Sequence, residues 1–126
     1  MAFKLGSENR NIKTSVSFGK KLVNKNGNMG PGVVAQANND GSIDVDPNID
    51  MNSRFGKRVI KHEQCHLDQM ESGKADYGDN WVMWEDKIYI RKEENGEPII
   101  DGPNGKWPEG HPNHPWEAEA VEAEDQ

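Results

Sequence analysis

Two histidines and a glutamate stand together near the middle of the chain, in the order His62-Glu63-Gln64-Cys65-His66. At about 100° per helical residue, His66 lies roughly 40° around the axis from His62, so both imidazoles leave one face. Glu63 lies about 100° from His62 and about 60° from His66, near enough to reach a water between them. Two imidazoles at this spacing can hold zinc, which lowers the pKa of a bound water. The H-E-x-x-H pattern therefore predicts a zinc site with Glu63 as general base.

A catalytic zinc site needs a third protein ligand and an open fourth position. The longer pattern with a third histidine fails here, because Gln69 replaces its glycine and Ser72 replaces its histidine. The third ligand is therefore expected further along the chain. The candidates there are Glu85, His111, His114, Glu117, Glu119 and Glu122.

H-E-x-x-H followed by E-x-x-A on a second helix resembles the gluzincin class of zinc metallopeptidases. Glu117 and Ala120 match the second motif. The resemblance implies that Glu117 is the third ligand and that Ala120 packs against the active-site helix. Many gluzincins have an aspartate one residue after that alanine to brace a histidine ligand, and this chain has Val121. Another acid or a backbone carbonyl is therefore expected to brace the histidine.

A wider resemblance covers residues 35–120 and points to small metallopeptidase-like proteins of tailed bacteriophages. It rests on the helix motif, an Asp-Tyr pair at 76–77, the pattern Trp-x-x-Lys-Ile-Tyr from Trp84, and Pro-Trp-Glu-x-Glu-Ala from Pro115. The resemblance implies a minimal zincin-like fold and hydrolysis of peptide bonds. It also implies a location in the host cytoplasm or in a virion, with virion proteins as partners.

Glu119 is the rival third ligand, and it lies about 200° around a helix from Glu117, so both cannot face one ion. A solvated position is nevertheless the expectation for Glu119, as it is for Glu122, Glu124 and Asp125. His114 and Tyr77 are candidates for stabilising the oxyanion of a tetrahedral intermediate, with His111 as a further substrate contact. The alternative for these three residues is a structural role on the surface.

The expected elements place these residues on a small α+β framework. A helix is predicted over residues 54–71, after an N-cap at Asp50 or at Asn52-Ser53 and before Gly73. Hairpins are predicted for 33–37 with 42–46 and for 81–84 with 87–91, a long loop for 94–115, and a short helix after Pro115. Residues 1–32 are expected as a poorly ordered or peripheral arm, and residues 33–120 as the core of a single domain.

The composition supports a small polar domain that needs help to fold. The 126 residues carry a net charge of −7, and only 33% are hydrophobic. An acidic chain is not expected to bind nucleic acid, and no apolar run is long enough to cross a membrane. Met1 to Arg10 has no apolar core typical of a secretion signal, which favours a cytoplasmic location. One cysteine excludes an intramolecular disulfide, and Cys65 is expected to be a small buried residue.

The sequence thus predicts an α+β, minimal zincin-like fold, in which a small twisted sheet packs on one active-site helix. The leading hypothesis is a Zn²⁺-dependent peptidase with ligands His62, His66 and Glu117. An extended peptide would bind between that helix and the strand at residues 42–46. The alternative is a structural or interaction protein, such as a virion component, that zinc stabilises. A third, weaker hypothesis is that the substrate is a peptidoglycan cross-bridge.

Overall fold

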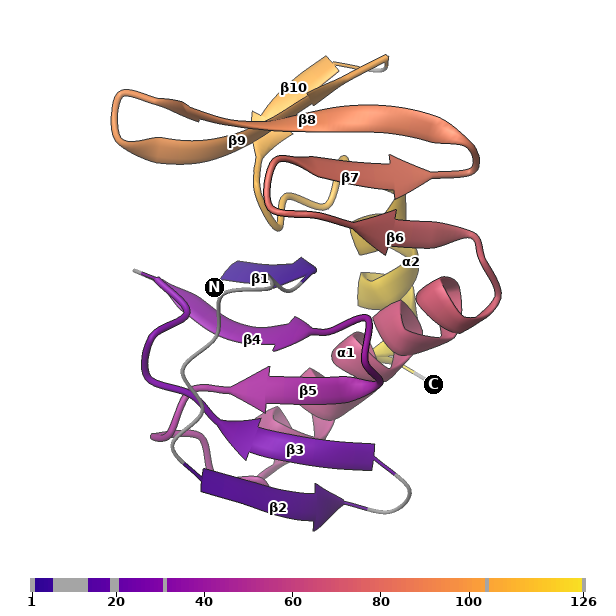
Figure 1. The fold of residues 1–126 in the computed structure, drawn as a ribbon. Coiled ribbons are helices and arrows are strands. Elements are labelled where there is room, and N and C mark those ends of the chain that lie inside the picture. Colours follow the sequence, from indigo (N-terminus) through magenta and orange to yellow (C-terminus); the bar gives the residue numbers. More distant parts are fainter. Residues whose placement is uncertain (1, 6–13, 19–20, 31, 104, 126) are drawn as a thin grey trace.

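The computed structural model describes residues 2–5, 14–18, 21–30, 32–103 and 105–125. Over these residues the chain forms two five-stranded sheets and two helices (Figure 1). The fold is therefore α+β, as the sequence predicted. Within the same residues, no helix is long and apolar enough to cross a membrane.

The first sheet is built from the N-terminal part of the chain, with strand order β1-β4-β5-β3-β2. Its strands are β1 (Ala2–Leu5), β2 (Thr14–Phe18), β3 (Lys21–Lys25), β4 (Val33–Ala37) and β5 (Ser42–Val45). The predicted β4–β5 hairpin is confirmed, and Gly41 in its turn has φ +88°. Residues 1–32 are not merely a peripheral arm, because their described segments supply three strands.

Strand β5 lies inside this sheet and not at an accessible edge. It pairs with β4 on one side and, in parallel, with β3 on the other. Its backbone groups are therefore used within the sheet, and an extended peptide cannot add to it. The predicted substrate cleft along residues 42–46 is wrong for this reason.

Helix α1 (Arg54–Glu71) has the predicted bounds. Ser53 is the N-cap and its hydroxyl accepts a hydrogen bond from the Gly56 amide at 2.9 Å. Gly73, with φ +81°, follows the other end of the helix. The helix covers one face of the first sheet through a shared core of buried residues, Val23, Ala35, Ala37, Ile43, Val45, Val59, Ile60 and Leu67.

The second sheet is an antiparallel meander with order β10-β9-β8-β7-β6. Its strands are β6 (Ala75–Tyr77), β7 (Trp81–Trp84), β8 (Lys87–Glu94), β9 (Glu97–Gly102) and β10 (Gly105–Pro108). The predicted β7–β8 hairpin is confirmed. The predicted long loop over 94–115 is wrong, because Asn95 and Gly96, with φ 54° and 79°, form a two-residue turn between β8 and β9.

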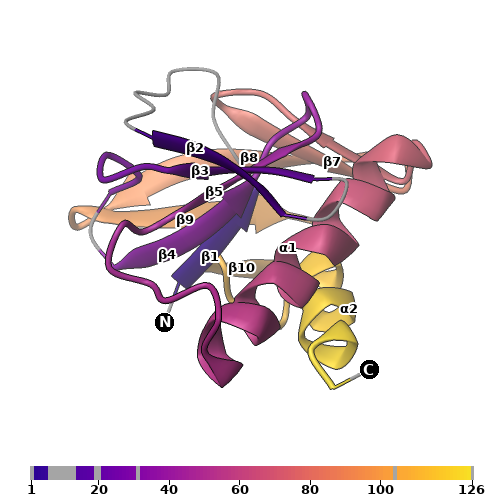
Figure 2. The ribbon, with the colours of Figure 1, turned by 90° about the horizontal axis from the view of Figure 1, so that it is seen from below.

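Helix α2 (Pro115–Ala123) confirms the predicted C-terminal helix and lies beside α1 (Figure 2). Pro115 occupies its first turn, where a missing amide hydrogen costs nothing. Trp116 is 1% exposed and packs edge to face on Tyr89 of the second sheet. Because α1 packs on the first sheet and α2 on the second, the contact between the helices joins the two halves of the fold.

Candidate metal centre

The contact between α1 and α2 brings His62, His66 and Glu117 together. Their potential ligand atoms all lie within 4.8 Å of one another. One carboxylate oxygen, Glu117 Oε1, lies 2.8 Å from His62 Nε2 and 2.9 Å from His66 Nε2. The three side chains thus form a cluster that could hold a metal ion. Of the third-ligand candidates, Glu117 is the one found in this cluster.

Three carboxylate oxygens in and beside the cluster are buried without a hydrogen-bond partner. They are Glu117 Oε2 and both oxygens of Glu63. Glu63 and Glu117 are each 0% exposed, so bulk water does not solvate these atoms. A buried carboxylate without partners is costly, because it loses its hydration and gains nothing in return. A bound cation with its own water would satisfy such oxygens, so these unpaired atoms fit a metal ion.

Charge coupling inside the cluster opposes the effect of burial. Burial lowers the pKa of His66, but the nearby Glu117 carboxylate outweighs it and raises that pKa to about 9. Burial also raises the pKa of Glu117, but His66 and His62 outweigh it and lower that pKa to about 2. Without a metal, Glu117 and His66 therefore form a buried ion pair, and metal binding must displace a proton from His66.

The outer nitrogen of each histidine has its own partner. His66 Nδ1 lies 2.8 Å from Gln69 Oε1, an atom that can only accept, so Nδ1 carries the hydrogen. His62 Nδ1 lies 2.6 Å from Glu124 Oε2, and Arg58 donates to the other oxygen of that carboxylate at 3.2 Å. In both rings Nε2 is left facing Glu117, which is the orientation that a ligand needs.

Glu124 was expected to be solvated, and this expectation is wrong. Its side chain is only 12% exposed, because it lies against His62. Glu124, the C-cap of α2, follows Glu117 by seven residues, which places it on the same helical face as Glu117. This seven-residue spacing was the signal in the sequence that could have indicated a position for Glu124 near the metal ligands. Glu124 takes the bracing role that Val121 cannot take.

Substitution Glu124→Ala is expected to weaken metal binding by roughly 10- to 100-fold, because it removes the partner that orients His62. Competition titration against a chelator of known affinity would measure this change. Glu122→Ala is the matched control, since Glu122 is an exposed acid on the same helix. Equal affinities for both variants would show that His62 needs no bracing.

The rival acids lie elsewhere. Glu119 is 42% exposed, pairs with Lys74 and accepts a hydrogen bond from Gln69 at 3.1 Å. Gln69 also donates to the Trp116 carbonyl at 3.0 Å, so it ties α1 to the backbone of α2. Glu119 therefore helps to hold Gln69, which contacts His66, and lies outside the ligand cluster. Two other candidates, Glu85 and Glu122, are exposed.

The three residues predicted to contact the substrate each have a partner within the protein, and their contact with a substrate stays a prediction. His114 Nε2 lies 3.2 Å from the carbonyl oxygens of Trp107 and Pro108, and its ring stacks on Trp116. His111 stacks on Trp107 with ring centres 5.3 Å apart. The Tyr77 hydroxyl accepts a hydrogen bond from the Asn39 amide at 3.0 Å.

Cys65 is half-buried, and burial raises the pKa of its thiol to about 11. A raised thiol pKa lowers the share of reactive thiolate at neutral pH, and Cys65 is not part of the described cluster of His62, His66 and Glu117.

No protein-family model, curated protein or solved structure matches this chain. The resemblance to gluzincins and phage proteins therefore stays an expectation from short motifs. The structure adds one observation: His62 and His66 of the H-E-x-x-H motif on α1 lie beside Glu117 on α2.

Proposed function

We propose that the protein is a zinc-dependent peptidase, with His62, His66 and Glu117 as zinc ligands and Glu63 as general base. Two imidazole nitrogens and one carboxylate oxygen are a ligand set that zinc accepts in hydrolytic enzymes. When bound there, zinc would supply a Lewis acid and lower the pKa of a water in its fourth position. Both histidines present Nε2 toward Glu117 Oε1, so the three potential ligand atoms converge on one point.

The unpartnered carboxylate of Glu63 is the observation that carries this proposal. Both of its oxygens are buried and lack hydrogen bonds, and the residue is next in sequence to His62. A purely structural metal site has no need for a second carboxylate at this position. Burial raises the pKa of Glu63 to about 7, against the opposite effect of His66 and His62. Glu63 is thus suited to accept a proton from an attacking water and to pass it to the leaving nitrogen.

A structural role for the metal is the second candidate, and the burial of the site favours it. His62, His66 and Glu117 are each at most 1% exposed. A metal here would tie α1 to α2 and so join two small cores in a chain that is only 33% hydrophobic. In this case the protein would bind zinc without cleaving peptides.

Two measurements on the purified protein separate these functions. Mass spectrometry is expected to find about one zinc ion per chain. A mixture of unstructured peptides is expected to be cleaved, with cleavage lost after treatment with 1,10-phenanthroline and regained when zinc is added back. Bound zinc without cleavage would favour the structural role. Absence of zinc from protein grown with zinc would contradict both functions.

A further inference from the structure

Strand β1 lies between the two halves of the fold (Figure 1). It is an edge strand of the first sheet and pairs with β4 in parallel, with Ala2 beside Val33 and Leu5 beside Ala37. On the other side, the Leu5 side chain is 1% exposed and packs in the core of the second sheet. Strand β1 therefore contacts both halves at once.

The second half holds Leu5 in the way that a binding site holds one residue of a peptide. The side chain lies in an apolar core with Tyr77, Trp84, Tyr89, Ile100 and Trp116. Arg91 Nη2 donates to the Leu5 carbonyl oxygen at 2.9 Å, and Arg91 Nη1 lies 3.2 Å from Glu109 Oε1. An apolar pocket for a side chain, combined with hydrogen bonds to the main chain, is how proteins recognise extended peptides.

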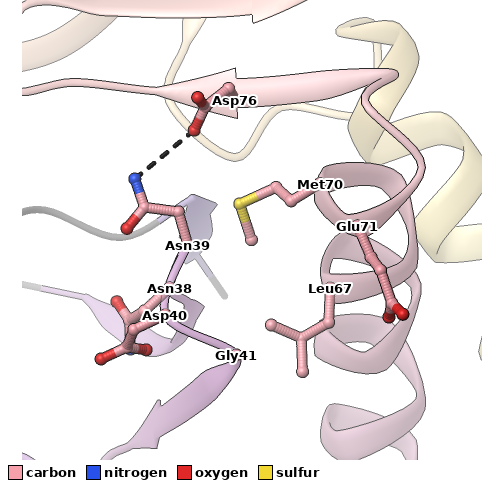
Figure 3. Close-up of a pocket in the computed structure, with 8 residues that line it drawn as sticks. All are labelled: Asn38, Asn39, Asp40, Gly41, Leu67, Met70, Glu71 and Asp76. Carbon is pink, nitrogen blue, oxygen red and sulfur yellow. Dashed lines mark hydrogen bonds between the residues drawn. The ribbon is translucent and has the colours of Figure 1, made fainter.

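The boundary between the halves is open beyond both ends of β1. Beyond its start, Val33 of β4 and Pro98 of β9 line a hollow of about 430 Å³. Beyond its end, Asn39 of the β4–β5 turn and Asp76 of β6 line a hollow of about 480 Å³ beside α1 (Figure 3). Each hollow has walls from both halves, so β1 occupies the middle of a longer groove.

This groove passes close to the metal centre. Trp116, in the same core as Leu5, directly precedes the ligand Glu117. Strand β4, the partner of β1, shares the other core with Leu67, which directly follows the ligand His66. Strand β1 thus lies where the two ligand-bearing helices meet the two sheets.

A peptide cannot reach the metal centre unless a neighbouring element moves. The four residues proposed for zinc binding and catalysis are each at most 1% exposed: His62, Glu63, His66 and Glu117. Strand β1 is suited to move because it is only four residues long and pairs on one side. Parallel pairing is slightly less stable per residue, and the register is irregular between Ala2 and Phe3. Without β1, the backbone of β4 becomes an edge to which an extended peptide can add.

We propose that β1 is a self-bound segment in the groove that takes an extended peptide substrate, and that the peptide enters by replacing it. The Leu5 position of the groove then selects a large aliphatic side chain. The word substrate rests on the peptidase function proposed above, whereas the exchange of β1 for a peptide does not. The first two experiments therefore measure no cleavage.

The first experiment measures binding of acetyl-Ala-Phe-Lys-Leu-amide, which copies residues 2–5, to the isotope-labelled full chain by NMR. In Leu5→Ala, the segment of the chain itself competes less well for the groove. The probe is therefore expected to bind this variant roughly tenfold or more tightly than the wild-type protein, because apparent affinity follows the fraction of open sites. The amide signals of Gln36 and Ala37 are expected to shift. Equal affinity for both proteins, or binding to neither, would overturn the proposal.

Two controls accompany this measurement. A probe with aspartate in place of leucine is expected to bind neither protein, because the Leu5 pocket is apolar. Val121→Ala removes an aliphatic side chain that is 44% exposed on α2, and its affinity should equal that of the wild-type protein. Leu5→Val makes a smaller cavity than Leu5→Ala, and its affinity should lie between those of Leu5→Ala and the wild-type protein. It replaces Leu5→Ala if that variant does not fold.

The second experiment is native-state hydrogen exchange of the wild-type protein at low denaturant concentrations. Amides of β1 are expected to exchange through local openings that depend little on denaturant, whereas those of the interior strand β5 should follow global unfolding. The same exchange free energy and denaturant dependence in both strands would mean that β1 leaves only when the whole protein unfolds. That result would contradict the proposal.

Peptide cleavage by the zinc-loaded protein is the third experiment. Leu5→Ala is expected to raise kcat/KM for leucine-containing peptides roughly tenfold, whereas Val121→Ala should match the wild-type protein. Loss of a merely structural strand would lower activity instead. Probe binding as expected, without cleavage by any variant, would support the exchange of β1 and remove the peptidase function. Cleavage that Leu5→Ala does not raise would contradict the exchange and leave the peptidase function standing.

Discussion

Substitution Glu117→Ala is expected to abolish stoichiometric metal binding. The carboxylate is the only contribution of α2 to the described ligand cluster, and His62 and His66 would remain as a two-ligand site. Removal of a direct ligand should exceed the roughly 10- to 100-fold loss that is typical when a bracing partner is removed. Mass spectrometry of the purified variant is expected to find almost no zinc, while the wild-type protein retains about one ion per chain.

The same substitution should remove the stabilisation of the folded protein by the metal. In the wild-type protein, a metal that binds only the folded chain raises the free energy of unfolding, so chelation is expected to lower the Tm. In Glu117→Ala, chelation should leave the Tm unchanged. Glu117→Gln keeps the side-chain volume and separates the loss of the ligand charge from the cavity left by alanine. Zinc retained at one per chain in both variants would place the third ligand elsewhere.

Helix α1 could be predicted because its signals are local. The H-E-x-x-H spacing, the serine cap at Ser53 and the glycine stop at Gly73 all lie within one continuous segment. Glu117 required the resemblance to E-x-x-A, since its distance from His62 in sequence carries no geometric information. Glu124 was missed because its role depends on how α2 lies against α1, although its spacing from Glu117 placed both acids on one helical face.

The sheets were less predictable, because their pairings are long-range. Parallel strands need crossover connections, so no short turn signal marks the β3–β5 pair. This pair makes β5 an interior strand and removes the substrate cleft that the hairpin pattern had suggested. Strands β8 and β9 were missed where they meet, because Glu94 and Glu97 flank the Asn95-Gly96 turn with charge instead of apolar residues. The turn dipeptide itself was present in the sequence.

Substitution Glu63→Gln is expected to separate metal binding from catalysis. Glutamine has nearly the same size as glutamate but cannot accept a proton at neutral pH. The three ligands are unchanged, so zinc content should stay at about one per chain. If Glu63 is the general base, peptide cleavage should fall by roughly 10²- to 10⁴-fold. Zinc content and kcat measured on the same preparation would show both effects.

The control for Glu63→Gln should remove a charge from the same helix without touching the site. Asp68→Asn meets this condition, because Asp68 is exposed on α1 and its partner is the Gln64 side chain. Its cleavage rate should match that of the wild-type protein. Cleavage retained in Glu63→Gln would remove Glu63 from the mechanism, since neither His62 nor His66 can serve as base while bound to the metal. Loss of zinc in that variant would instead make Glu63 part of the metal site, and the buried unpartnered carboxylate would then be a ligand.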